Sequence, residues 1–130
     1  MMETIFLQDE IKRCLLTDRL GEAGAVVLEF SYPEGFLGFR GHFPGDPILP
    51  GVCMFQSLRI GLEHAWRAPL RLVEIVSAKF ISPSRPGDML VFTARPCATQ
   101  GTAITMKTRV TRGDKRVAEF TVILERPTEV

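Results

Sequence analysis

The histidine at position 42 is, by its neighbours, the residue of this chain best suited to chemistry. His42 lies in the segment Gly41–Val52, GHFPGDPILPGV, directly before a long apolar stretch. Prolines fix φ at three positions of this segment and its glycines permit close approaches, so we expect a stiff loop. Pro50 suits the first turn of a helix and would leave the N–H groups of residues 51–53 without intrahelical acceptors. An imidazole facing such donors could transfer a proton while the donors stabilise an oxyanion.

A second polar feature follows on the expected helix. Gln56, Arg59 and Glu63 form a stripe on an otherwise apolar segment. Arg59 and Glu63 are i,i+4 neighbours, so we expect them to pair. Glu63 is about 10 Å along the helix from Gln56, too far to replace an acid there. The stripe either belongs to a site or faces solvent or a partner helix, and the residues leave both interpretations open.

Other reactive residue types have structural explanations. Asp46 is expected to stabilise a turn, His64 to gain from the helix dipole, and Cys53 to act as a small buried hydrophobe. No spacing of His, Cys, Asp and Glu predicts a metal site, and no Gly-rich strand-to-helix turn predicts a nucleotide site. We therefore expect no metal and no cofactor.

The elements that must position these residues are predicted from hydrophobic patterning. A helix from Gly51 to about Trp66, apolar nearly all round, should be buried. A short amphipathic helix is expected over Leu7–Arg19, as part of an N-terminal helical extension over residues 1–20. Extended segments are predicted over Ala25–Phe30, Leu70–Ile81, Met89–Pro96, Thr102–Thr111 and Lys115–Glu125. The three junctions between the last four segments are short enough for antiparallel hairpins. These elements predict one α+β domain, residues 1–130, in which a curved antiparallel sheet wraps a central helix.

Composition excludes several classes of protein. The chain has 130 residues with 16 basic and 15 acidic side chains, so we expect no general affinity for nucleic acid or an anionic membrane. Its three cysteines fit neither a disulfide framework nor a CxxC metal site, and the reducing cytoplasm is the expected location. No apolar run predicts a membrane span.

Two segments together resemble a known family. Gly41–Val52 matches the pattern GHFPGxPxxPGV, and Lys79–Asp88, KFISPSRPGD, matches KFxxPxxPGD. Both patterns, in this order, are similar to those of the 3-hydroxyacyl-acyl-carrier-protein dehydratases of fatty-acid synthesis (FabZ/FabA-like), which have the hot-dog fold. With the segments between and after them, the resemblance spans about Ala25 to Glu125. It implies a helix wrapped by a strongly curved sheet, in a dimer whose active tunnel lies at the subunit interface.

The resemblance also implies a site. His42 of one subunit would face a helix carboxylate of the other, but this chain has Gln56 where the family has Glu or Asp. The N–H groups of Gly51 and Val52 would polarise the thioester carbonyl, beside Pro50. An apolar tunnel for an acyl chain could be lined by Phe36, Phe39, Phe43, Met54, Phe55 and Phe80, each of which could equally be ordinary core.

The leading hypothesis is a lyase that dehydrates 3-hydroxyacyl thioesters, carried on acyl carrier protein or CoA, to trans-2-enoyl thioesters. His42 would act as the base and Gln56 would hold the substrate hydroxyl or a water, because an amide has no acidic proton to give. This one-base scheme predicts that Gln56→Glu raises turnover and that His42→Ala abolishes it.

The alternative is a non-catalytic acyl-thioester-binding protein or the partner subunit of a hetero-oligomeric dehydratase, paired with a carboxylate-bearing homologue. A hot-dog thioesterase ranks lower. We expect a homodimer, or a higher assembly of dimers, in the leading case. Because carrier proteins are acidic, a docking patch would be basic, with four candidate residues: Arg67, Arg71, Lys79 and Arg85.

Overall fold

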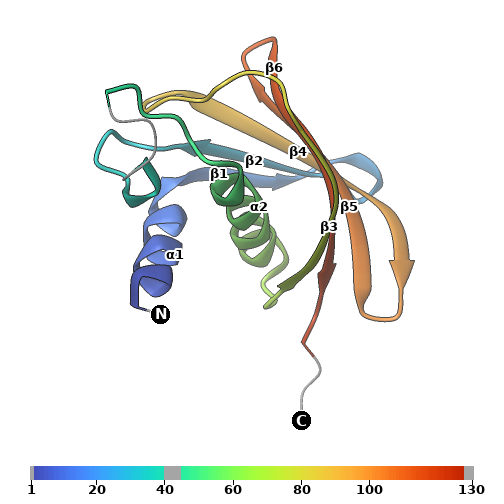
Figure 1. Cartoon of the computed structure of the whole chain (residues 1–130). Helices are drawn as coiled ribbons and strands as arrows, with labels where there is room; N and C mark the ends of the chain where they lie inside the picture. The colour runs from blue at the N-terminus through green and yellow to red at the C-terminus, as the bar shows by residue number, and fades with distance from the viewer. Residues whose placement is uncertain (1, 40–44, 128–130) are drawn as a thin grey trace.

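A six-stranded antiparallel sheet bends over a central helix in the computed structural model, which describes residues 2–39 and 45–127, with side chains from residue 7 onwards. The strand order is β1-β2-β4-β5-β6-β3. The main elements are α1 (Met2–Cys14), β1 (Leu15–Leu20), β2 (Val26–Ser31), α2 (Gly51–Trp66), β3 (Arg71–Phe80), β4 (Met89–Gln100), β5 (Ala103–Arg112) and β6 (Lys115–Glu125). Short 3₁₀ turns lie at Glu22–Gly24 and Leu37–Phe39. Figure 1 shows α2 under the curve of the sheet with α1 beside it, which confirms the predicted α+β architecture.

The N-terminal segment departs from the prediction. The expected helix over Leu7–Arg19 is wrong in its second half, because α1 ends at Cys14 and Leu15–Leu20 forms β1. This strand pairs antiparallel with β2, in a register that places Leu20 opposite Val26. The helical spacing of its leucines was misleading, since pairing to a neighbouring strand overrides a weak local preference. The helical extension over residues 1–20 is corrected accordingly.

Two of the three expected hairpins form. The β4–β5 and β5–β6 connections are residues 101–102 and 113–114, where Gly101 and Gly113 have positive φ. Strand β4 runs on to Gln100, so the turn expected over residues 97–101 is shorter than predicted. The junction Ser82–Asp88 is not a hairpin, because β3 pairs with β6 and lies at the edge of the sheet while β4 lies between β2 and β5. The short length of this junction did not show that β3 and β4 lie in separate parts of the sheet. As a result β3 has one neighbour and a free edge.

Helix α2 is buried, as its all-round apolar sequence predicted. Leu58 and Leu62 are fully buried, and the helix lies so close to β2 that a Cβ on Gly61 would come within 2.4 Å of Leu28 Cδ1. The hydroxyls of Tyr32, just after β2, and Ser57 on α2 are 2.6 Å apart, and Ser57 Oγ donates to the Cys53 carbonyl at 2.6 Å. These contacts fix the rotation of α2 beneath the sheet. In the part of the chain that the structure describes, no helix is long and apolar enough to cross a membrane.

Candidate active site

The start of α2 presents two free backbone donors. The helix begins at Gly51, and Pro50 is its N-cap, with φ −66° and ψ 149°. The Cys53 N–H donates to the Pro50 carbonyl at 3.0 Å, so the expected set of three free donors is corrected to two. Within the described residues, the N–H groups of Gly51 and Val52 have no acceptor. They retain the geometry that can polarise a carbonyl oxygen.

The two segments that carry the family resemblance are joined directly. Leu49 N–H donates to the Ser84 carbonyl at 2.8 Å, and Arg85 Nε donates to Asp46 Oδ1 at 3.0 Å. The hydrogen bond and charge of Arg85 hold the pKa of the Asp46 carboxyl below its usual range. Asp88 accepts from the Arg85 N–H at 2.9 Å, which closes the second turn. Asp46 therefore links the two segments, in addition to the turn role expected for it.

The two remaining loop predictions, His42 and Phe43, lie outside the described residues. The described loop resumes at Gly45, with a φ of 87° that favours glycine. The roles of His42 and Phe43 stay predictions.

Aromatic side chains gather at the helix start. The ring centroids of Phe55 and Phe80 are 6.0 Å apart, and a Cβ on Gly51 would lie 2.4 Å from Phe80 Cζ. A side chain at position 51 would therefore force the Phe80 ring to move. Phe80 is 52% exposed, whereas Phe55 is buried and packs edge-to-face on Phe120. The structure thus brings three predicted substrate-binding residues together. Other candidate lining residues, Phe36, Phe39 and Met54, are buried in the core.

The polar stripe of α2 is a connected network. Gln56 Oε1 accepts from Arg59 Nε at 2.8 Å, and Arg59 Nη1 donates to Glu63 Oε1 at 3.1 Å, which confirms the expected i,i+4 pair. The other oxygen of Glu63 accepts from the Leu70 N–H at 2.7 Å. Glu63 is therefore committed to the network and cannot serve as an acid at position 56.

Cys53 has no role as a nucleophile in this arrangement. Its side chain is buried, and burial raises the pKa of its thiol to about 11, so it stays protonated near neutral pH. This agrees with the expected packing role. His64, at the far end of α2, lies 3.0 Å from an Asp18 carboxylate oxygen, a contact that links α2 to β1.

An uncovered apolar surface adjoins the helix start. Every residue of β3 except Leu72 is exposed, and β3 is an edge strand. Most large exposed hydrophobic residues of the described chain lie at the start of α2 or in and just after β3: Val52, Val73, Ile75, Val76, Phe80 and Ile81. Contiguous apolar exposure beside an unpaired strand edge is typical of an interface.

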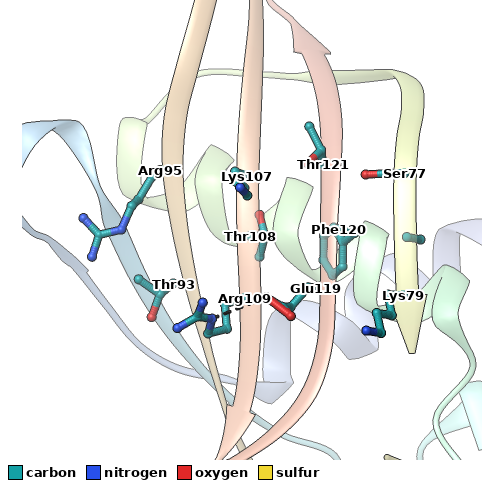
Figure 2. Close-up of a pocket in the computed structure, with 11 residues that line it drawn as sticks. Ser77, Lys79, Thr93, Arg95, Lys107, Thr108, Arg109, Glu119, Phe120 and Thr121 are labelled. Carbon is teal, nitrogen blue, oxygen red and sulfur yellow. Dashed lines mark ion pairs between the residues drawn. The ribbon is translucent and has the colours of Figure 1, made fainter. Parts of the chain in front are cut away.

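A separate hollow of about 510 Å³ lies on the opposite face of the sheet from α2 (Figure 2). Figure 2 shows cationic side chains from β3, β4 and β5 around it, including Lys79, Arg95, Lys107 and Arg109. Arg95 lies directly opposite Lys107, while Arg109 pairs with Glu119 at 3.7 Å. Sequence reasoning missed this hollow, although outward-facing cations at alternate positions of β5 were a signal. The sheet separates it from Gln56, so it is not part of the candidate site.

The basic residues expected to dock a carrier protein differ in their surroundings. Arg85 is paired with Asp46, and Arg71 is paired with Glu125. Lys79 lines the hollow on the outer face, and Arg67 ends α2 in a left-handed conformation. The docking role of all four remains a prediction.

The chain is similar in sequence to a family of dehydratases. A family model described as ApeI dehydratase (ApeI-like) matches residues 18–120. The chain is 33% identical over 115 residues to 3-hydroxyacyl-acyl-carrier-protein dehydratase FabZ of Hydrogenobaculum sp. (strain Y04AAS1), a match covering 81% of this chain and 76% of that protein. FabZ of Wolbachia sp. subsp. Drosophila simulans (strain wRi) is 36% identical over 92 residues, which cover 62% of this chain and 63% of that protein. The chain thus spans less than two thirds of that relative, and only 42% of FabZ of Desulfotalea psychrophila (strain LSv54 / DSM 12343).

Solved structures share the fold. The dehydratase heterocomplex ApeI:P from Xenorhabdus doucetiae superposes with a TM-score of 0.69 at 20% identity, covering 86% of this chain and 96% of that chain. The E. coli PaaI protein gives a TM-score of 0.62 at 15% identity, covering 96% of each chain. At these identities the likeness concerns the fold alone, and it confirms the predicted hot-dog architecture.

Proposed function

Because the chain belongs to the ApeI-like dehydratase family, we propose that it dehydrates 3-hydroxyacyl thioesters carried on an acyl carrier protein to trans-2-enoyl thioesters. The observation that carries this proposal is the direct contact between the two signature segments at the start of α2, through Leu49–Ser84 and Asp46–Arg85. That contact holds residues 45–50, the described part of the Gly/Pro loop, directly before the free N–H groups of Gly51 and Val52. The similarity to 3-hydroxyacyl-acyl-carrier-protein dehydratases supports the reaction and the carrier.

The proposed reaction uses one base. The thioester carbonyl oxygen accepts hydrogen bonds from Gly51 and Val52, which stabilise the enolate-like charge that develops there. His42 removes the proton on the carbon next to the carbonyl. The C–O bond to the 3-hydroxyl then breaks as the double bond forms, and the imidazolium returns its proton to the leaving oxygen to give water. Gln56 holds that oxygen by a hydrogen bond.

The site is proposed to be completed by a second subunit. The free edge of β3 and the exposed Val52, Ile75 and Phe80 would be covered by the same surface of another chain, as closed pairing requires. The acyl chain would lie between the subunits beside Phe55 and Phe80. The free cysteines Cys14, Cys53 and Cys97 support a location in the reducing cytoplasm.

A second candidate function follows from Gln56. This chain lacks the carboxylate that the family resemblance implies at that position, and a structurally similar protein is a dehydratase heterocomplex. The chain would then pair with a carboxylate-bearing homologue and contribute His42 to a composite site. The same exposed edge of β3 would serve this pairing.

One assay separates the two functions. Purified protein, alone and mixed with a carboxylate-bearing homologue, is tested for interconversion of 3-hydroxyacyl and enoyl carrier-protein thioesters. Turnover by the chain alone supports the self-sufficient enzyme, and turnover only in the mixture supports the partner subunit. No turnover in either sample, above that of the homologue by itself, would contradict both.

A further inference from the structure

The contact between Gln56 and Arg59 determines what Gln56 can offer to a ligand. Arg59 Nε, which can only donate, lies 2.8 Å from the Gln56 side chain, so the atom it meets must be the amide oxygen. That oxygen is engaged by Arg59. Among the described residues, the amide nitrogen of Gln56 has no acceptor. Gln56 therefore presents N–H donors to any molecule bound beside it.

Arg59 is held in place by further contacts. Its Nη1 donates to Glu63 Oε1 at 3.1 Å, and Glu63 Oε2 accepts from the backbone N–H of Leu70 at 2.7 Å. The Arg59 side chain is only 12% exposed. A continuous path of hydrogen bonds thus runs from the backbone just before β3 to the side chain at position 56.

We propose that Arg59 is a positioning residue, which fixes Gln56 as a hydrogen-bond donor to the 3-hydroxyl oxygen of the substrate and would deprive a carboxyl at position 56 of its proton. The inference rests on the proposed function. The amide N–H stabilises negative charge on the leaving oxygen without transferring a proton, and the proton comes from His42. The Gln56–Arg59 pair thus provides hydrogen bonding where a carboxyl would provide acid catalysis.

This inference changes what substitution of Gln56 should do. The sequence alone predicts that Gln56→Glu raises turnover by supplying an acid. A guanidinium in contact favours the ionised carboxylate and lowers a carboxyl pKa by about 1–3 units from the ordinary ~4.3. Beside Arg59 the new carboxyl would stay ionised, and so unable to donate, down to a lower pH than an ordinary carboxyl. Any gain in turnover from Gln56→Glu should therefore begin at a higher pH when Arg59 is also removed.

A titration tests the positioning directly and needs no turnover. Glutamate labelled with ¹³C at the carboxyl is followed by NMR in Gln56→Glu and in the double variant Gln56→Glu/Arg59→Met. We expect the introduced carboxyl to titrate below ~4.3 in the first protein and about 1 unit or more higher in the second. Equal pKa values in the two proteins would overturn the inference, even if the protein proves to be a dehydratase.

Kinetics supply the second test. Arg59→Met should lower kcat roughly tenfold or more with little change in KM, because a misplaced group costs up to ~100-fold. Arg59→Lys should recover part of the loss. Arg95→Met, on the far side of the sheet, is the matched control and should leave kcat unchanged. At mildly acidic pH the double variant should exceed Gln56→Glu in kcat, and it should lose that gain as its carboxyl deprotonates toward neutral pH.

The outcomes are separable. An Arg59→Met protein that folds with the wild-type thermal midpoint and keeps the wild-type kcat would overturn the inference. A wild-type protein that dehydrates nothing, alone or with a homologue, would end the proposed function while the titration still decides the role of Arg59.

Discussion

The two sides of α2 differ in how far the rest of the chain covers them. On the side that faces the sheet, Leu58 is fully buried, Gly61 allows contact with Leu28, and Ser57 bonds to Tyr32. On the other side Val52 is 58% exposed, and the polar network of Gln56 continues away from it. One side holds the fold together, and the other has the polar groups and unburied apolar surface that a ligand or second subunit would use.

Stability and function therefore depend on different sides of α2. Substitutions on the sheet side should act on folding, and those on the open side should act on assembly or turnover.

Truncation of a side chain on the buried side of α2 should have the largest effect on stability. Leu58→Ala should lower the free energy of unfolding by about 2–5 kcal/mol, because it leaves a cavity beneath the sheet. Val52→Ala, on the open side of the same helix, should change it by less than about 0.5 kcal/mol when measured on a monomer. Urea unfolding at low protein concentration measures both. Similar losses for the two variants would remove the distinction between the sides.

Loss of the hydrogen bond between Ser57 and Tyr32 should have the next largest effect on stability. The size of the effect should depend on which of the two residues is changed. Ser57→Ala leaves the Tyr32 hydroxyl buried without its partner, so we expect a loss of about 1–3 kcal/mol. Tyr32→Phe removes the buried hydroxyl itself and should cost only about 1 kcal/mol. Chemical denaturation distinguishes them. The reverse order would show that the bond does not fix α2 to β2.

Charging the open edge should act on assembly. Val76→Lys places a charge on the exposed edge strand β3, which opposes pairing with another strand. We expect the proposed dimer to dissociate at least tenfold more easily, about 1.4 kcal/mol, in analytical ultracentrifugation. Thr99→Lys, an exposed site on β4, is the control and should leave the dimer intact. An unaffected Val76→Lys dimer would place the interface elsewhere.

The ion pair that links the loop to the second signature segment should give the smallest effect. Arg85 lowers the pKa of Asp46, so the stabilisation is complete above the ordinary Asp pKa of ~3.9 and is lost as pH falls through the lower folded value. Arg85→Ala should lower the thermal midpoint slightly at pH 7, and the gap to wild type should close in strong acid. A gap that persists there would point to lost packing.

The main features of the site were predictable because they are local. The bounds of α2 followed from Pro50, Gly51 and an uninterrupted apolar run, and the structure reproduces them. The Arg59–Glu63 pair followed from i,i+4 spacing. The contact from Arg59 to Gln56 was not predicted, because it depends on a side-chain conformation that spacing does not specify.

The missed features depend on residues distant in sequence. Leu15–Leu20 is a strand because β2 lies beside it, and no local signal outweighed the helical spacing of its leucines. The edge position of β3 depends on which strand β6 pairs with, so the junction after β3 was taken for a hairpin. The Cys53 N–H is satisfied by Pro50 because Pro50 is the N-cap, one position before the helix.

The most direct test of the proposed reaction is hydration of a trans-2-enoyl carrier-protein thioester by wild type and by His42→Ala, each with the assembly partner that wild type requires. The account predicts that the variant keeps the wild-type fold and loses at least ~10²-fold in kcat, the usual worth of general acid–base catalysis. A His42→Ala protein with wild-type kcat would contradict the account, because the proposed reaction assigns both proton transfers to His42.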